Sequence, residues 1–323
     1  MHNQGLYLTS KMSRTRHLAS TRKDAFVREA KALGFAEVGV AVAGFLEEEA
    51  PKLEEWLKRG YQGEMGYLER NAEKRLDPRL LVPGAKTVVS LLFNYHVEEE
   101  EMDEETPRIA SYARGQDYHH VLKWKLKELM KWAQATWGDV NGRVFVDSAP
   151  VHERAWAARS GLGWVGKNSL LLNQRMGSFF FIADLIIDVD LEPDAPTADH
   201  CGTCTRCIDA CPTGAIIQPE VVDGSKCISY YTIELQGAIP EPVHKHLKPW
   251  VFGCDICQDV CPWNRHATPN TEPKFSAHPQ LASMGRSDWK EMTEEVFQEV
   301  FRGTAVKRTG YEGLMRNLQA AFK

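Results

Sequence analysis

The spacing of the cysteines constrains this chain more than any other feature of its sequence. All eight cysteines lie between Cys201 and Cys261. The first run, which starts at Cys201, reads C-x₂-C-x₂-C-x₃-C-P, the spacing of a bacterial two-cluster ferredoxin. The second run, which starts at Cys254, reads C-x₂-C-x₃-C-P and lacks one close cysteine, which Cys227 is left to supply. The pattern therefore predicts two [4Fe–4S] clusters.

The same motif class predicts how the cysteines divide between the clusters. Three cysteines on a tight turn bind one cluster, and the cysteine beside proline reaches the other. We assign two ligand sets: Cys201, Cys204, Cys207 and Cys261, and Cys211, Cys227, Cys254 and Cys257. Two zinc sites remain the alternative, because Cys-x₂-Cys pairs also bind zinc. The third cysteine at the same spacing and the Cys-Pro pair that ends both runs favour iron–sulfur clusters.

Composition excludes other classes of protein. The 323 residues are 43% hydrophobic and 26% charged, which is ordinary for a folded globular protein. No run of about 18 apolar residues occurs, so we expect no membrane-spanning helix. The net charge is −5, but the run 98–105 carries seven acids, so the remainder of the chain is net +2. We expect that run to be a solvated loop.

The start of the chain bears on its location. The first twenty residues are basic, contain Ser and Thr, and have no apolar core of the length that a secretory signal needs. They weakly resemble a transit peptide, but we favour an N-terminal extension over 1–22 without fixed structure. Cysteines that serve as metal ligands instead of disulfides fit a reducing compartment. The predicted location is therefore the cytoplasm.

Helix and strand patterns alternate before the cysteines and predict an α+β fold. We expect helices at 23–33, 53–61, 65–74, 118–137 and 149–160, and strands at 35–42, 86–95, 143–147 and 178–188. Pro193 and Pro196 mark a linker. The predicted domains are a catalytic domain over 23–192, a ferredoxin-like domain over 193–268 and a helical basic tail over 269–323.

Asp147 is the carboxylate that the pattern singles out in the first domain. It ends an apolar strand and precedes a predicted helix, so it points into a cleft or caps that helix. If a large apolar cofactor shielded Asp147, the pKa of its carboxyl would rise and it could donate a proton. His119 and His120 start a long helix, where a surface or capping role is the simpler interpretation.

The glycine-rich segment 161–169 matches two nucleotide-binding patterns incompletely. It contains G-x-G-x-x-G, but it follows a predicted helix instead of a strand. It also nearly matches the phosphate-binding G-x₄-G-K-[ST] pattern, but Asn168 replaces the hydroxyl residue that would hold magnesium. We therefore expect a tight loop packed beside another cofactor.

Several long motifs in a fixed order resemble the epoxyqueuosine reductases. They are MGYLERN (65–71), SYARGQDYHH (111–120), VDSAPVHERAWAARSGLGWVGKNSLL (146–171) and GSFFFIADLI (177–186), with both cysteine runs and the KR and RN pairs near the end. The resemblance covers about residues 24–320. It implies cobalamin in a nitroreductase-like α+β domain, followed by two [4Fe–4S] clusters. The reaction that it implies is removal of the epoxide oxygen of epoxyqueuosine at the wobble position of tRNA.

The same resemblance implies roles for individual residues. Asp147 matches the family's proton-donating aspartate. The implied cobalamin contacts are Arg70, Asp147, Ser229 and Tyr230, with Arg154 and Asn168 as further candidates. The basic stretch 302–323 is expected to meet tRNA phosphates through Lys307, Arg308, Arg316 and Asn317.

The expected partners follow from these roles. They are tRNA and an external electron donor, with no membrane, and the chain is expected to be a monomer. Two alternatives stay open. One is a corrinoid reductive dehalogenase, although no twin-arginine export signal occurs. The other is a ferredoxin-type electron carrier fused to a binding module.

Overall fold

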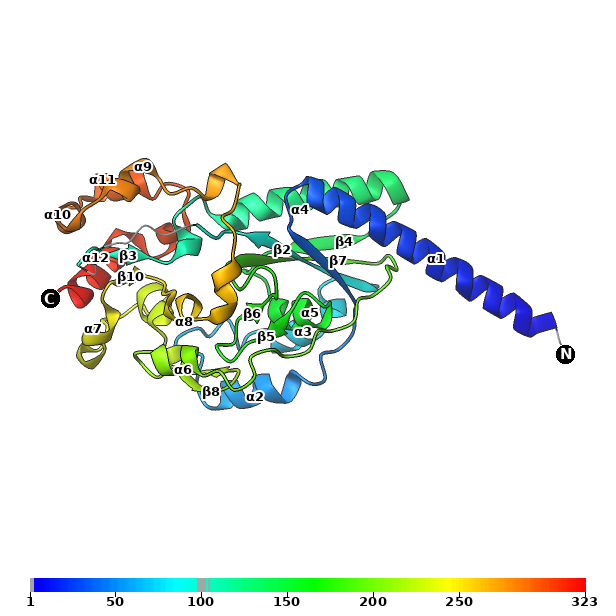
Figure 1. Cartoon of the computed structure of the whole chain (residues 1–323), viewed down its shortest axis with the longest axis horizontal. Helices are drawn as coiled ribbons and strands as arrows, with labels where there is room; N and C mark the ends of the chain where they lie inside the picture. Colours follow the sequence, from blue (N-terminus) through cyan, green and yellow to red (C-terminus); the bar gives the residue numbers. More distant parts are fainter. Residues whose placement is uncertain (1–2, 98–102, 104) are drawn as a thin grey trace.

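The computed structural model describes residues 3–97, 103 and 105–323 (Figure 1). The predicted acidic loop at 98–105 lies mostly outside the described residues. Helix α1 (Asn3–Ala32) projects from the body of the molecule, and the two termini lie at opposite ends of its long axis. In the described part of the chain, no helix is both long enough and apolar enough to cross a bilayer.

A four-stranded antiparallel sheet forms the framework of the first domain. Its order is β1-β2-β7-β4, with bounds Glu37–Val42, Thr87–Asn94, Phe180–Ile187 and Gly142–Phe145. The two central strands, β2 and β7, are buried along nearly their whole length. That burial explains their almost continuous apolar sequence, because both faces of the sheet are covered.

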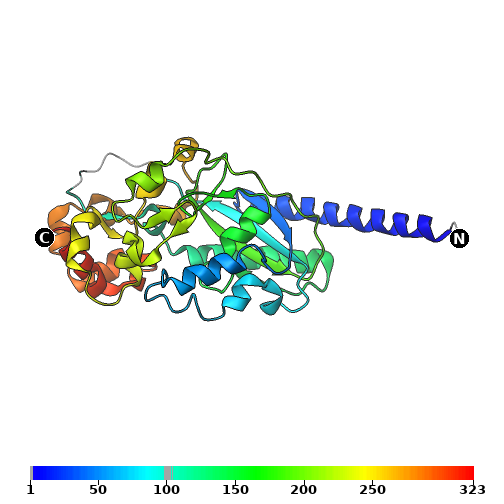
Figure 2. The same cartoon turned by 90° about the horizontal axis from the view of Figure 1, so that it is seen from below.

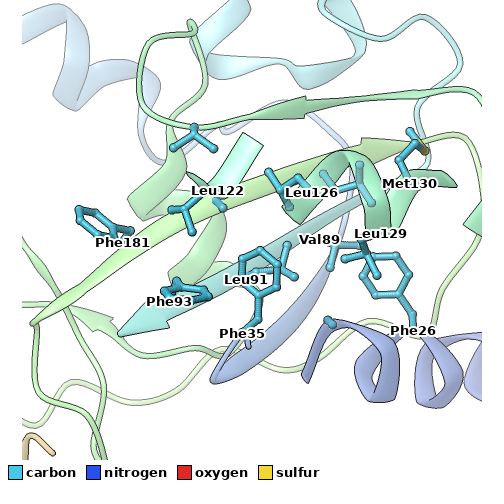
Figure 3. Packing of buried hydrophobic residues seen from close by; sticks show 14 of the residues in the cluster. Phe26, Phe35, Val89, Leu91, Phe93, Leu122, Leu126, Leu129, Met130 and Phe181 are labelled. Atoms are coloured by element: carbon cyan, nitrogen blue, oxygen red, sulfur yellow. The ribbon is translucent and has the colours of Figure 1, made fainter. Parts of the chain in front are cut away.

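Helices cover both faces of this sheet. Helix α4 (Tyr118–Trp137) and the C-terminal part of α1 pack on one face, where Phe26, Phe35, Leu91 and Leu126 meet (Figure 3). Helix α5 (Glu153–Arg159) packs on the other face through Trp156, which is fully buried. Two short helices, α2 (Ala50–Lys58) and α3 (Ala72–Leu76), lie on the same side as α5 (Figure 1).

Three helix predictions differ from the structure. Helix α1 begins at Asn3, so residues 3–22 are helical where we expected no fixed structure; Gly5 is the last glycine before Gly34, and proline is absent from this stretch. The helix expected at 65–74 is confirmed only at 72–74, within α3: turns run to Asn71, whose φ angle of 63° interrupts regular helix. The helix expected at 149–160 begins only at Glu153, after Pro150.

The cysteine segment and the C-terminal helices share a second core. Strand β10 (Trp250–Phe252) pairs in parallel with β3 (Arg108–Ile109), and α12 (Gly310–Ala321) packs against β10 and α7 (Glu241–Leu247). The predicted tail is therefore not a separate module. The remaining elements here are α6 (Arg206–Ala210), β8 (Ile216–Gln218), β9 (Val221–Val222), a π-helix (Tyr230–Glu234), α8 (Ile256–Asp259), α9 (Pro279–Ser283), α10 (Arg286–Lys290) and α11 (Glu294–Val300).

Candidate active site

Asp147 follows the end of strand β4 in a strained backbone conformation. Its φ angle is 55°, a left-handed value that Asp tolerates better than most residues. The N–H of Asp147 donates to Glu153 Oε1 at 2.6 Å, which fixes the turn between β4 and α5. The side chain of Asp147 is 54% exposed, yet burial is the largest influence on the pKa of its carboxyl. We use the name hollow for the region around this half-exposed carboxyl, which Tyr118, His119 and Arg308 border.

The start of helix α4 supplies the hydrogen-bond partners of Asp147. The hydroxyl of Tyr118 donates to Asp147 Oδ2 at 2.5 Å, and His119 Nε2 lies 3.2 Å from the same oxygen. On its other side, His119 Nδ1 lies 2.7 Å from Asp117 Oδ1. Asp117 also accepts from the backbone N–H of His119 and so caps α4. The three side chains form a continuous line from Asp117 through His119 to Asp147.

Electrostatic interactions set the protonation states of His119 and Asp147. Burial alone would lower the pKa of His119, but its hydrogen bonds to Asp117 and Asp147 raise the pKa to about 9. Burial would raise the pKa of Asp147, but hydrogen bonds from His119 and Tyr118 hold it below its ordinary value. At neutral pH the pair is therefore an imidazolium and a carboxylate.

A second group of side chains reaches the hollow from the C-terminal half. Arg308 Nη2 pairs with Glu234 Oε2 at 2.7 Å, and the Arg308 guanidinium lies 6.0 Å from the ring centroid of Tyr67. The charge of Arg308 helps to lower the pKa of Asp147. The hollow therefore lies between the first domain and the π-helix that follows Cys227.

The remaining charged groups near Asp147 come from α3 and α5. Burial and then the nearby carboxylates of Asp184 and Asp147 raise the pKa of Glu153 well above its ordinary value. The guanidinium of Arg75 donates to Tyr67 O at 3.3 Å, and the guanidinium of Arg154 donates to Ser169 O. Among the described residues, the buried atoms Arg75 Nε and Gln62 Oε1 have no hydrogen-bond partner.

The cysteines form two neighbouring groups with the predicted memberships. In the first group, burial raises the pKa of Cys207 and Cys261, and the nearby thiols of Cys201 and Cys204 raise it further. The four members line one cavity of about 320 Å³, together with Asn168 and Trp263. The indole N–H of Trp164 donates to Cys201 Sγ at 3.4 Å.

The second cysteine group lies deeper and on the side of the hollow. Burial raises the pKa of Cys227, Cys254 and Cys257; the nearby Cys211 thiol adds to the rise at Cys227, and the Cys227 thiol adds to the rise at Cys254 and Cys257. The charge of Cys207 also raises the pKa of Cys257, so the two groups are adjacent. In the part of the chain that the structure describes, no three Cys, His, Asp or Glu side chains converge on a single metal ion. A cluster spaces its cysteines more widely than one ion does, since each sulfur binds a different iron.

Comparisons with known proteins identify both halves of this arrangement. Residues 200–264 match a family model described as "4Fe-4S double cluster binding domain", and residues 75–148 match one described as "Epoxyqueuosine reductase QueG, DUF1730". The epoxyqueuosine reductase of Cellulophaga algicola is 58% identical over 295 residues, which cover 91% of this chain and 96% of the relative. The chain belongs to the epoxyqueuosine reductase family.

More distant epoxyqueuosine reductases agree with this assignment. The Escherichia coli protein is 41% identical over 90% of this chain and 78% of its own length. A crystal structure of a selenomethionine-labelled epoxyqueuosine reductase has a TM-score of 0.86 at 30% identity, over 93% of this chain and 80% of that one. Another, with a TM-score of 0.85 at 30% identity and the same coverage, holds an epoxyqueuosine-modified tRNA-Tyr stem loop. The predicted family and α+β fold are confirmed, and the double-cluster match favours iron–sulfur over zinc.

The residues that the family resemblance implied as cobalamin contacts surround the hollow and the second cysteine group. Asp147 and Arg154 lie at the hollow, and Arg70 is exposed on the loop that carries Tyr67. The hydroxyl of Ser229 is hydrogen bonded to the Cys227 thiol. Tyr230 is buried, and its hydroxyl accepts from the backbone N–H of Glu64 at 3.1 Å. The amide of Asn168 donates to Cys257 O at 3.5 Å, so Asn168 contacts the cluster segment directly.

Two of the four predicted tRNA contacts are wrong. Asn317 is 0% exposed, and its amide donates to Thr232 O and Val251 O at 2.8 Å each. The guanidinium of Arg316 donates to the carbonyls of Tyr231, Leu235 and Gly237. Both side chains brace the π-helix after Cys227 and the strand before Cys254. Lys307 is exposed. Arg308 is also exposed, and its guanidinium pairs with Glu234 beside the hollow.

His119 is the functional residue that sequence reasoning missed. We interpreted it as a surface or capping residue, but its ring joins Asp117 to Asp147. The available signal was the family motif at 111–120, which ends in two histidines. Helix periodicity alone could not distinguish inward His119 from His120, whose side chain is 85% exposed.

Proposed function

We propose that this chain reduces the epoxide of epoxyqueuosine to the alkene of queuosine at the wobble position of tRNA. Family membership supports the reaction, and the stem loop bound by a solved relative supports the substrate. The observation that carries the proposal is the placement of Asp147, with its proton-bearing neighbours, near Arg308 and near Glu234 of the π-helix that follows Cys227.

The hollow suits cobalamin as the cofactor. A corrin carries amide side chains around its rim and a phosphate in its nucleotide loop, and these groups need both donors and acceptors. Gln62 Oε1 and Arg75 Nε are buried without a described partner, and the guanidinium of Arg154 lies nearby. These three side chains, with Tyr230, would hold the corrin rim. Reduced cobalamin, when bound, supplies a nucleophilic and strongly reducing metal centre for breaking a carbon–oxygen bond.

Asp147 and His119 would move the proton that the departing oxygen needs. Reduction of the epoxide to an alkene consumes two electrons and two protons and releases water. Asp147 is ionised at neutral pH, so it does not hold this proton by itself. The imidazolium of His119, 3.2 Å from Asp147 Oδ2, supplies it through the carboxylate. Asp117 stabilises the charged imidazole, and Tyr118 fixes the position of the shared oxygen.

The two cysteine groups would carry the electrons inward one at a time. The first group lines an open cavity, and the second lies beside it and follows on to the π-helix at the hollow. Two single-electron transfers along this route balance one epoxide. This order assigns the first cluster to electron entry and the second to electron delivery.

The tRNA would approach over the short segment that ends in Lys307 and Arg308. Lys307 is exposed, and Arg308 is anchored by Glu234 beside the hollow. Basic side chains at the mouth of a site attract the phosphates of the anticodon stem without reading its sequence. Met65 and Tyr67 lie on the facing loop, where Tyr67 is exposed.

Analysis of the wobble nucleoside tests the proposed function. Anaerobically reconstituted protein, cobalamin and dithionite are incubated with tRNA that carries epoxyqueuosine. The tRNA is then digested, and the masses of its nucleosides are measured by mass spectrometry. We expect loss of one oxygen atom from the modified nucleoside only when cobalamin is present. Conversion at the same rate without any corrinoid would contradict the assignment of the cofactor, and absence of conversion would contradict the reaction.

A further inference from the structure

The first cysteine group reaches the surface on the side of the molecule away from α1 and α4. The four residues between its close cysteines, Gly202, Thr203, Thr205 and Arg206, are exposed. The residues beside the second group, such as Ile228, Gly253 and Asp255, are buried. Figures 1 and 2 show α6 and α8, which carry cysteines of both groups, at a distance from α1 and α4. An external electron donor therefore meets the first group before the second.

A basic rim surrounds this exposed edge. We define the rim as the basic residues that line the cavity: Lys167, Arg206, Arg265, His200 and His266. No Asp or Glu lines the cavity in the described part of the chain. Asp199 and Asp209 lie close in sequence, but Asp199 accepts from the N–H of Cys201 and Asp209 accepts from the hydroxyl of Thr205. The three cations Lys167, Arg206 and Arg265 outnumber these two carboxylates, so the rim carries a net positive charge on a chain whose net charge is −5.

Two members of the rim, Arg206 and Arg265, carry charges that no described residue pairs with, so they can interact with a partner. Lys167 Nζ donates to the carbonyls of Gly202 and Cys204, so it supports the cysteine loop. Arg206 and Arg265 are exposed, and neither guanidinium has a hydrogen bond or ion pair to any described residue. Unpaired exposed arginines beside a redox centre attract a negatively charged partner and speed its association.

The centre of the rim is aromatic. The rings of Trp263 and His200 line the cavity with their centroids 5.9 Å apart, and the buried ring of Trp164 packs against both at 5.0 Å. An apolar centre inside a charged margin is typical of small, transient protein interfaces. Such interfaces suit electron carriers, which must dissociate after each transfer.

We propose that this surface is the docking site of a small acidic one-electron carrier protein. The inference rests on the proposed function, since it supplies the electrons that the reduction consumes. In each encounter the carrier would give up one electron to the cluster that the first cysteine group would hold. Two encounters and two protons reduce one epoxide to one alkene and one water.

Charge reversal of the two unpaired arginines tests the docking site. The holoenzyme with Arg206→Glu and Arg265→Glu is compared with the wild type for binding to purified acidic flavodoxin, measured by flavin fluorescence anisotropy across a series of salt concentrations. We expect the double variant to bind flavodoxin at least about 10-fold more weakly at low salt, with a flatter dependence on salt. A matched variant, Arg28→Glu with Lys127→Glu on the distant helices α1 and α4, changes the net charge equally and should bind as the wild type does.

Turnover with two reductants separates this inference from the proposed function. The rate driven by reduced flavodoxin is divided by the rate driven by dithionite, a small reductant that needs no protein interface. The docking site predicts that this ratio falls at least about 10-fold in the Arg206→Glu, Arg265→Glu variant. An unchanged ratio, or flavodoxin affinity equal to that of the wild type, would overturn the docking site. Absence of turnover with dithionite in the wild type would instead contradict the proposed function and leave the binding result to decide the docking site.

Discussion

His119 Nε2 lies 3.2 Å from Asp147 Oδ2, and the two residues come from different elements, the start of α4 and the end of β4. The other ring nitrogen of His119, Nδ1, lies 2.7 Å from Asp117 Oδ1. Tyr118 and Arg308 are the other polar groups that act on the same carboxylate. Because of this contact, we infer that His119 and Asp147 deliver the proton together. At neutral pH the proton resides on the imidazole of His119.

The first prediction concerns the pH dependence of turnover. The pKa of His119 is raised to about 9, so the imidazolium is present at neutral pH and is lost as pH rises through that value. The single-turnover rate with dithionite should therefore be level near neutral pH and fall above about pH 9. His119→Gln should lower the rate about 10²-fold or more and remove this alkaline fall. His120→Gln, at the exposed neighbour, should keep the wild-type profile, and an identical profile in His119→Gln would contradict the role of the pair.

The second prediction concerns the brace formed by Asn317. Its buried amide bonds Thr232 O and Val251 O, which lie in the segments that carry Cys227 and Cys254. Asn317→Ala leaves these carbonyls unpaired, which should lower the free energy of unfolding by on the order of 2 kcal/mol. The thermal midpoint should fall, and the iron content after reconstitution should drop toward that of one cluster. Gln319→Ala on the exposed side of α12 is the control, and iron content equal in both variants would show that the brace does not position the cluster segment.

The third prediction concerns Asp184, which is fully buried in β7 with Oδ2 lacking a described partner. Burial raises its pKa to about 7 from an ordinary value of 3.8, although a hydrogen bond from Ser90 opposes the shift. The folded state binds this proton more tightly than the unfolded state, so Asp184 destabilises the fold increasingly as pH rises from about 3.8 to about 7, and by a constant amount above that range.

Asp184→Asn removes this titration and should remove its contribution to the loss of thermal stability between about pH 4 and about pH 7. Differential scanning fluorimetry at a series of pH values measures the slope. Asp190→Asn, at an exposed position in the same domain, should leave the slope unchanged. A slope over this range in Asp184→Asn equal to that of the wild type would refute the buried proton.

Sequence reasoning succeeded where the chemistry is local in the chain. The cysteine spacing predicts both clusters, because a tight turn fixes which thiols can reach one cluster. The apolar runs predict the central strands β2 and β7, since buried strands of a covered sheet leave no place for polar residues. Asp147 could be singled out because it ends such a strand.

Contacts between segments that are far apart in the chain could not be predicted from the sequence. His119 meets Asp147 only after α4 packs across the sheet, so its role could not be read from helix periodicity. Arg316 and Asn317 follow a basic pair and suggested contact with phosphate, but α12 turns both inward against the π-helix and β10. The expected helix at 65–74 formed only at 72–74 because positive φ angles at Gly63 and Asn71 depend on neighbouring loops such as that of Tyr230.

Asp147→Asn tests the central claim most directly, because it removes the carboxylate and keeps the shape of the side chain. Single-turnover conversion of epoxyqueuosine in tRNA is followed by mass analysis of the wobble nucleoside, with iron content and the corrin absorption spectrum measured on the same sample. We expect both clusters and cobalamin to be retained while the rate falls about 10²-fold or more. A variant that retains its cofactors and converts the nucleoside at the wild-type rate would show that Asp147 does not deliver the proton.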